Sequence, residues 1–566
     1  GPIMTDSGTF QSYVYGDVDV DYLDIIKFQR DIGSDIGTIL DIFGTPNITK
    51  RESEDGITET IKRAKESAKV KKEMILACTV QGSIYPDLRT SCAKELSKFE
   101  SDFFPIGGVV PLMEMQRYSD LLNVIISSKI GLDPSKPVHL FGAGHPLIFP
   151  IAVALGCDFF DSSSYVKYAV DDRLIFPWGT EKLDSLSEIP CNCPICSRLN
   201  ASELKNLEKT KRTKEIAKHN LYICFSELKK IRNAISQGSL WELVERRASS
   251  NPYLLNAMKV LRKKDYRNWL EKHDPISKKS AMFYTGRNTI HRPIIYRIQK
   301  RLKSNLLNKK FPTIVFKEAT KPYSFSYNKE IKQVLSKNHK LNLIVKSPIG
   351  PVPLELDEMY PFAQSIFPKE TDIETESIVN EFLKDFTMDN KTYEWNGEKT
   401  LEFIEKVDNK DNNFDLKRVS AVCDMQFGKS TGKKLLKGKI RIVKSKKTKK
   451  IRNIYSDDKH ILSMRATDGM FTLKIEGAKI LHKNFKKPFL RVIIDDDAVP
   501  FVKDGKSVFS KFVVDCDKNL RPFDECLIVD KKDNLIACGR TLLNLEEMIA
   551  FSDGMGVKNR EKIKNY

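Results

Sequence analysis

Short apolar runs alternate with amphipathic stretches of helical length through about the first 165 residues. Runs rich in Val, Ile and Phe predict strands, and the stretches between them place apolar residues on one face of a helix. We expect strands at residues 2–5, 37–41, 74–80, 103–110, 137–141 and 157–160, with helices that include residues 22–30, 57–71 and 118–130. This rhythm of strand and helix indicates an α/β fold built on parallel strands.

Five of the six predicted strands end in polar or glycine-rich residues. In a parallel barrel all carboxyl ends of the strands face one mouth, so the rhythm predicts a (β/α)8 TIM-like barrel with a site at that mouth. A doubly wound open sheet has the same rhythm and is the alternative. Six units do not close an eight-stranded barrel, and we therefore expect the N-terminal units to be missing.

Beyond residue 200 the pattern changes. Lysine-rich amphipathic stretches such as residues 221–235 and 240–247 predict helices up to about residue 340, where strand-like patterning resumes. A basic segment at residues 429–452 holds twelve Lys or Arg and no acidic residue, and turn-rich short strands follow from residue 488. We expect a barrel with a metal-binding subdomain at 1–250, a helical connector at 251–345, a basic α+β accessory domain at 346–487 and a small β-rich domain at 488–566.

The chain carries an excess of positive charge. Lys and Arg number 94 against 75 Asp and Glu, which gives a net charge of +19. Such an excess attracts polyanions, so nucleic acid is the expected partner, with a merely solubilising surface as the alternative. The sequence has no apolar run of about 18 residues and no secretory signal among its first twenty, so we expect a cytoplasmic protein without a membrane span.

Three cysteines lie close together at Cys191, Cys193 and Cys196, and His219 follows 23 residues after the last of them. Three thiolates and one imidazole form the closed tetrahedral shell of a structural zinc site, which leaves no position for substrate or activated water. We therefore predict one structural Zn²⁺. The alternatives are free thiols in a loop and a histidine that simply sits on a helix.

Two aspartates occupy similar positions, because Asp6 and Asp161 both follow an apolar strand and both precede a serine. In a barrel they would lie at the same mouth, where one carboxylate can attack a sugar C1′ and the other can act as a general acid and base. Each pattern alone is more typical of a turn or a helix N-cap. The pair is nevertheless the best candidate for catalysis.

Other residues at the predicted mouth suit a flat, guanine-like base. Asp41 offers only hydrogen-bond acceptors, Gln81 offers a donor and an acceptor, and the glycines Gly107 and Gly108 let the backbone approach closely. The aromatic residues that could sandwich the ring are Phe10 and Phe141. A solvated turn aspartate and ordinary core phenylalanines are the simpler interpretations.

Taken together, these motifs resemble one family. The chain contains PIMTDSGTFQ at residues 2–11, PIGGVVPL at 105–112, GHP at 144–146 and DFFDS at 158–162, followed by the cysteine cluster. This order is similar to that of archaeal tRNA-guanine transglycosylases. The resemblance continues through QFGK at 426–429, GKK at 432–434, DDDA at 495–498, RPFDE at 521–525 and GR at 539–540.

The resemblance implies a (β/α)8 barrel, a Cys₃His zinc site and a C-terminal PUA β-barrel that binds RNA. It implies replacement of guanine at position 15 in the tRNA D arm by 7-cyano-7-deazaguanine (preQ0), in archaeosine biosynthesis and through a covalent intermediate. Asp161 would be the nucleophile and Asp6 the acid and base, while Asp41, Gln81 and Gly108 would recognise the base. A homodimer is also implied. The residues expected to contact tRNA are Lys429, Lys433, Lys434, Lys446, Lys447 and Arg540.

Two other functions are compatible with these motifs. One is an archaeosine synthase-like paralogue, which modifies the inserted base and needs no glycosidic nucleophile. The other is a non-catalytic tRNA-binding protein in which the basic and terminal domains act and an incomplete barrel does not.

Overall fold

The computed structural model describes residues 1–566 apart from 12–15, 17–19, 100, 307–310, 408–412 and 564–566. The chain forms two compact units, Gly1–Trp269 and Leu270–Tyr566. None of the helices in the described ranges has an apolar stretch long enough to cross a membrane.

The first unit is built on parallel strands that follow one another in chain order. They are β1 (Met4–Thr5), β2 (Ile36–Thr38), β3 (Ile75–Ala77), β4 (Phe104–Ile106), β5 (Val138–Leu140) and β6 (Phe159–Phe160). β1 to β3 and β4 to β6 form two parallel sheets, and parallel bridges between Ala77 and Phe103 and between Val80 and Ile106 join β3 to β4. The parallel α/β arrangement is confirmed, and a strand lies at each of the six predicted positions, although every strand is shorter than predicted.

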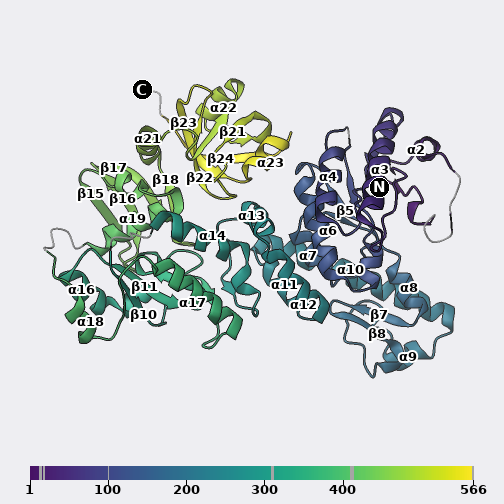
Figure 1. The fold of residues 1–566 in the computed structure, drawn as a ribbon, viewed down its shortest axis with the longest axis horizontal. Helices are drawn as coiled ribbons and strands as arrows, with labels where there is room; N and C mark the ends of the chain where they lie inside the picture. The colour runs from purple at the N-terminus through teal and green to yellow at the C-terminus, as the bar shows by residue number, and fades with distance from the viewer. Residues whose placement is uncertain (12–15, 17–19, 100, 307–310, 408–412, 564–566) are drawn as a thin grey trace. The chain divides into compact units, whose positions relative to one another are not determined.

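Helices connect these strands along the outside of the sheet (Figure 1). They include α2 (Tyr22–Asp31), α3 (Lys50–Val70), α4 (Pro86–Leu96), α6 (Tyr118–Gly131) and α7 (Phe149–Ala154). α3 begins seven residues before the predicted position 57, because Thr49 and Glu52 form a capping box that starts the helix. Its buried positions recur every three or four residues, as expected for a helix with one face on a sheet.

The strand predicted at 103–110 is shorter than expected. β4 ends at Ile106, and helix α5 (Val110–Glu114) begins where the prediction placed the end of the strand. Gly108 adopts φ +70° and Pro111 occupies the first turn of α5. The left-handed glycine ends the strand, and the proline is compatible with a helix start but not with a central strand.

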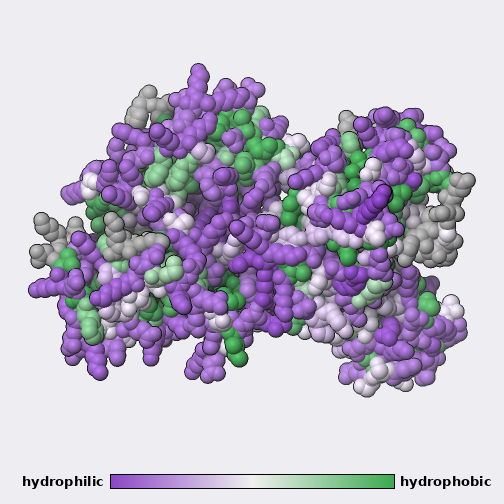
Figure 2. Space-filling view, viewed as in Figure 1, coloured by the Kyte–Doolittle hydropathy of each residue, from purple (hydrophilic) through white to green (hydrophobic). Residues whose placement is uncertain are grey.

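A small subdomain follows β6. The hairpin β7 (Arg173–Phe176) and β8 (Gly179–Lys182) packs with α8 (Ser164–Val170), α9 (Ala201–Lys205) and the long helix α10 (Lys209–Gln237). These elements share a compact apolar core that includes Leu174, Phe176 and Ile216. Figure 2 shows a mainly hydrophilic surface over the region of α9.

Among its described residues, the second unit has three sheets of four to six strands, and a continuous apolar core runs through them. The first sheet has the order β12-β11-β10-β14 and the second has the order β15-β16-β17-β18. Their strands are β10 (Thr313–Phe316), β11 (Asn342–Ser347), β12 (Gly350–Pro353), β14 (Thr392–Glu394), β15 (Ile440–Lys444), β16 (Ile451–Ser456), β17 (Lys459–Met464) and β18 (Phe471–Leu473). β10 lies in a stretch predicted to be helical, and that prediction is wrong there: four consecutive buried residues form a parallel strand too short for periodicity to reveal.

The C-terminal sheet has six strands in the order β20-β24-β23-β22-β19-β21. They are β19 (Arg491–Ile494), β20 (Val508–Phe509), β21 (Val513–Cys516), β22 (Glu525–Val529), β23 (Leu535–Thr541) and β24 (Met555–Lys562). The predicted β-rich terminal domain is therefore confirmed.

Candidate active site and metal centre

A cavity of about 940 Å³ lies at the carboxyl ends of the parallel strands in the first unit. Residues that follow each of the six strands line it, as the barrel prediction requires. All of the residues predicted to be catalytic or to bind the base contribute to its wall: Asp6, Phe10, Asp41, Gln81, Gly107, Gly108, Phe141 and Asp161.

Asp41 and Gln81 form the most buried polar pair in this cavity. Gln81 Nε2 donates a 2.5 Å hydrogen bond to Asp41 Oδ2, and the residues are only 7% and 2% exposed. Burial raises the pKa of Asp41 to about 6, although the hydrogen bond from Gln81 opposes the rise. Gln81 Oε1 has no hydrogen-bond partner among the described residues, so a ligand donor could satisfy it.

The glycines at 107 and 108 bring the backbone against this pair. A side chain at Gly107 would lie 2.5 Å from Gln81 Nε2, and one at Gly108 would lie 2.9 Å from the Gly44 carbonyl oxygen. The buried Arg89 holds the loop, since its guanidinium donates to the carbonyls of Val80 and Gly107 at 2.8 and 2.9 Å. The wall beside Asp41 therefore consists of backbone that a flat ligand could approach closely.

Asp6 follows β1 and Asp161 follows β6, and the structure places both on the cavity. The pKa of Asp6 is raised, first by desolvation from the protein around it and further by the charge of Asp161, while backbone hydrogen bonds from Gly8 and Ser7 oppose the rise. The side chain of Asp161 is 54% exposed. Both residues are solvent-exposed at the cavity, and the raised pKa of Asp6 suits a group that donates and accepts protons.

Two groups lie against one oxygen of Asp161. The Gly142 amide donates to Asp161 Oδ1 at 2.7 Å, and His139 Nε2 lies 2.9 Å from the same oxygen. The imidazole is buried on β5, with Phe141 packed edge-on at a centroid distance of 4.7 Å. Its distance to Asp161 suits a hydrogen bond, but the ring is turned out of alignment for one.

Phe10 lies in a helical turn that follows β1, and Phe141 lies in the turn that follows β5. Phe10 contacts Phe43 edge-on at 5.7 Å, and both rings line the cavity. Neither phenylalanine is fully buried, so ordinary core packing does not account for them. A planar ligand between these two turns could contact both rings.

His139 and Trp178 are two of the cavity residues that sequence reasoning missed. His139 lies in the middle of an apolar strand, where a buried core residue is expected. The polar side chain between Val138 and Leu140 is the feature of the sequence that could have identified it. Trp178 lies in the turn of the β7–β8 hairpin and lines the cavity although 44% of its surface is exposed. No motif of the sequence linked that hairpin to the cavity.

The predicted metal ligands are brought together in the subdomain. The ligand atoms of Cys191, Cys193, Cys196 and His219 lie within 4.8 Å of one another. Cys193 Sγ is 3.6 Å from Cys196 Sγ, close to the edge of about 3.8 Å expected for a tetrahedron of thiolates around zinc. His219 Nε2 lies 3.1 Å from the Ile175 carbonyl, which directs Nδ1 to the sulfurs of Cys193 and Cys196 at 3.6 and 3.2 Å. These four residues could hold a metal ion.

The basic segment 429–452 spans α20 (Thr431–Leu435), β15 and β16. Leu435 is fully buried and anchors α20 to the core of the second unit. The lysines predicted to contact tRNA are exposed at 429, 433, 446 and 447, with Lys434 partly so, and none forms an ion pair with a described residue. Arg540 differs, because its guanidinium lies 4.2 Å above the Phe523 ring and its Nε donates to the Phe523 carbonyl.

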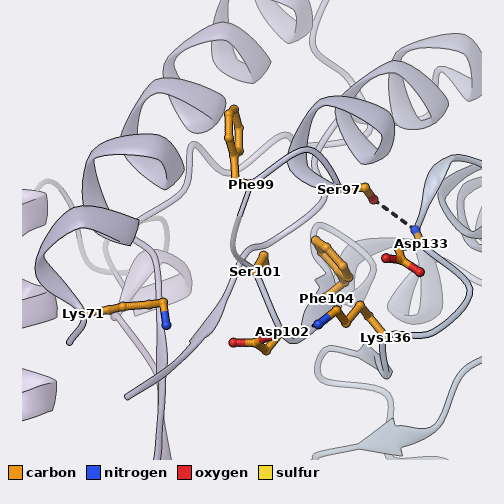
Figure 3. Close-up of a pocket in the computed structure, with 8 residues that line it drawn as sticks. All are labelled: Lys71, Ser97, Phe99, Ser101, Asp102, Phe104, Asp133 and Lys136. Carbon is orange, nitrogen blue, oxygen red and sulfur yellow. Dashed lines mark hydrogen bonds and ion pairs between the residues drawn. The ribbon is translucent and has the colours of Figure 1, made fainter. Parts of the chain in front are cut away.

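A second, smaller cavity of about 240 Å³ lies near the amino ends of β4 and β5 (Figure 3). Its polar groups serve to join loops: Lys136 pairs with Asp102 at 3.0 Å, and the Asp133 amide donates to Ser97 Oγ at 3.0 Å. In parallel barrels this end of the strands contributes stability rather than chemistry. The candidate site is therefore the larger cavity.

Comparisons with known proteins agree with the site. Residues 1–253 match the family described as queuine tRNA-ribosyltransferase, residues 417–488 match the patch-forming domain C2 of tRNA-guanine transglycosylase, and residues 490–563 match the PUA domain. The last match confirms the terminal PUA prediction. Similar proteins include the tRNA-guanine(15) transglycosylases of Methanosphaera stadtmanae and Methanothermobacter thermautotrophicus, each 42% identical over 99% of this chain and 86% of their own length. That of Methanobrevibacter smithii is 42% identical over 100% of this chain and 88% of its length.

Proposed function

Because the chain belongs to the tRNA-guanine(15) transglycosylase family, a family of glycosyltransferases, we propose that it replaces guanine at position 15 of the tRNA D arm with preQ0. The exchange would proceed through a covalent enzyme–tRNA intermediate and serve archaeosine biosynthesis. The observation that carries the proposal is the convergence of Asp6, Asp41, Gln81 and Asp161 on one cavity at the strand ends.

Base recognition would rest on the buried pair Asp41 and Gln81. The ionised carboxylate of Asp41 accepts hydrogen bonds, which suits the ring N–H and exocyclic amine of guanine and of its deaza analogue. Gln81 Oε1, which has no partner among the described residues, can accept another. The backbone at Gly107 and Gly108 can approach the base edge, while Phe10 and Phe141 contact its faces.

The reaction balances without an added cofactor. Asp161 attacks ribose C1′, the bond from C1′ to guanine N9 breaks, and guanine leaves with the bonding electron pair and takes a proton from Asp6. The incoming base then returns a proton to Asp6 and attacks C1′, which releases the Asp161 carboxylate. The raised pKa of Asp6 suits a proton carrier, and the exposure of Asp161 suits a nucleophile that must reach the sugar.

Contacts distant from the cavity would bind the body of the tRNA. Flipping a base out of folded RNA costs a few kcal/mol, and phosphate contacts can offset that cost. Lys429, Lys433, Lys434, Lys446 and Lys447 suit this role because they are at least partly exposed and unpaired among the described residues. The guanidinium of Arg540 is already engaged by Phe523, so we assign it a smaller share within the PUA domain.

The cysteine cluster would hold one structural Zn²⁺. The donor set is that of closed zinc sites, and the bond from His219 to the backbone fixes the tautomer needed for ligation. We further propose a homodimer and a cytoplasmic location, where tRNA is available.

Labelled guanine tests this function directly. The purified chain is incubated with unmodified tRNA and radiolabelled guanine, and the label in the tRNA is then chased with preQ0. We expect incorporation into tRNA that carries guanine at position 15, none when that base is adenine, and loss of label during the chase. Binding of tRNA without any incorporation would favour the non-catalytic alternative, and modification of preQ0-containing tRNA without exchange would favour the synthase-like one.

A further inference from the structure

Trp178 is an exposed aromatic residue at the rim of the cavity, and the proposed reaction leaves it without a role. It occupies the turn between β7 and β8, lines the cavity, and exposes 44% of its surface. A tryptophan gains much from burial, and its place in the cavity means that a ligand there can cover the exposed ring.

The ring is held in a fixed position before any ligand arrives. Phe176, which is only 1% exposed, stacks beneath it with an interplanar angle of 6° and a centroid distance of 5.0 Å. Trp178 Nε1 donates to Glu181 Oε1 at 3.1 Å, which fixes the rotation of the indole. Because Phe176 covers one face, the exposed surface lies on the other face and the edges. A rigid platform of this kind loses little conformational entropy on binding.

Burial places this platform on the solvent side of the base pocket. Asp41 and Gln81 are 7% and 2% exposed, whereas Trp178 is largely open. The turn of the hairpin faces the barrel, because Trp178, Gly179 and Thr180 line the same cavity as His145 of the barrel. The exchanged base would therefore pass the platform on its way to Asp41.

The chemistry of the rim fits a nucleotide. Lys167 of α8 lines the same cavity, is exposed, and pairs with no carboxylate among the described residues. A flat aromatic surface with a cation in the same cavity suits a base and its phosphate. An apolar protein segment would not explain the cation.

We propose that Trp178 stacks on an unpaired base of the tRNA that neighbours the exchanged guanine. The inference rests on the proposed function, because removing the guanine from its stack exposes a face of each neighbouring base. Stacking on Trp178 covers one of these faces again. The residue then acts in tRNA binding and does not touch the free base.

Three substitutions separate stacking from bulk. Trp178→Ala should weaken tRNA binding about 5- to 100-fold, and Trp178→Leu should behave similarly because it is apolar but not planar. Trp178→Phe should keep most of the affinity. The KM for free guanine should stay the same in all three proteins. A Leu variant that binds tRNA as well as the wild type, or a KM for guanine that rises with the Ala substitution, overturns the proposal.

Two further readouts test stacking with altered tRNA and with fluorescence. Two modified tRNAs are prepared, one lacking the base before the target nucleotide and one lacking the base after it. The wild type should bind one of the two more weakly than unmodified tRNA. Trp178→Ala should bind that tRNA and unmodified tRNA equally well. Equal losses of affinity in both proteins would contradict stacking. The chain has four tryptophans, and tRNA should quench the fluorescence of the wild type more than that of Trp178→Phe.

These outcomes are separable from the function itself. Binding and fluorescence are measured without turnover, so they report on Trp178 even if labelled guanine is not incorporated. Incorporation by the wild type with no effect of any Trp178 substitution would sustain the function and reject this inference.

Discussion

His139 Nε2 lies 2.9 Å from Asp161 Oδ1, at the carboxyl ends of two neighbouring parallel strands. The Gly142 amide donates to the same oxygen at 2.7 Å, and His139 contacts that oxygen without an aligned hydrogen bond, so Oδ2 is left for the ribose carbon. The imidazole is buried and packed edge-on by Phe103 and Phe141, which restricts its movement. We therefore regard His139 as a positioning residue for the proposed nucleophile.

Replacement of His139 tests this relationship. We expect His139→Ala to lower kcat for guanine exchange about 10- to 100-fold with little change in KM for guanine, because small displacements of a nucleophile cost rate more than binding. His139→Gln keeps a polar group at a similar reach and should recover part of the rate. An unchanged kcat in the Ala variant, or an increase confined to KM, would count against the positioning role.

The nucleophile is identified by the covalent adduct. We expect Asp161→Ala to lose the denaturation-resistant complex with tRNA on a gel and to lower kcat by about 10⁴-fold or more. Asp6→Asn should slow exchange, because proton transfer suffers, yet still allow some adduct to form. Asp171→Asn is a matched control at the same cavity and should keep the adduct. An adduct that persists in Asp161→Ala and disappears in Asp6→Asn would reverse the two assignments.

Loss of the metal should unfold the subdomain that carries Trp178. We expect about one zinc per chain by elemental analysis, and Cys196→Ser should lose it and lower the thermal midpoint, since the core around Leu174 and Phe176 is small. Cys224→Ser is the control, because this cysteine of α10 is not among the ligands. A zinc-free Cys196→Ser protein with an unchanged melting curve would mean that the metal does not stabilise the fold.

Much of the site could be predicted from where polar residues follow apolar runs. Asp6, Asp41 and Gln81 each follow a strand within a few residues, and parallel strands bring their carboxyl ends together whatever the helices between them contain. His139 could not be found in this way, because a side chain inside a strand faces the site only if the barrel curvature turns it inward. Trp178 was equally hidden, since its place at the cavity depends on a hairpin packed from another part of the chain.

The basic segment should control tRNA affinity through charge. We expect the double substitution Lys446→Gln and Lys447→Gln to weaken tRNA binding about tenfold at moderate salt. The slope of log affinity against log salt should fall by about 0.9 for each phosphate that the variant no longer neutralises. The control pair is Lys459→Gln and Lys479→Gln, which removes the same charge from lysines already paired with Glu476. If the two double substitutions weaken tRNA binding equally, the affinity depends on the net charge of the protein and not on a specific surface at Lys446 and Lys447.

Ionisation of Asp41 should favour recognition of the base but lower the stability of the fold. Its folded pKa of about 6 lies above the ordinary 3.8, so ionisation of Asp41 destabilises the fold progressively from pH 3.8 to 6 and by about 3 kcal/mol above that. Asp41→Asn stays neutral and can still accept from Gln81, so its thermal midpoint should exceed the wild type at pH 7 to 8 and converge with it near pH 4. In the wild type, kcat/KM for guanine should fall as pH drops below about 6, because a protonated carboxyl loses an acceptor. The proposed role of Asp41 as a buried carboxylate that binds the base would be refuted by either of two results. One is an Asp41→Asn protein that is no more stable than the wild type at pH 8, and the other is an Asp41→Asn protein that exchanges guanine as well as the wild type.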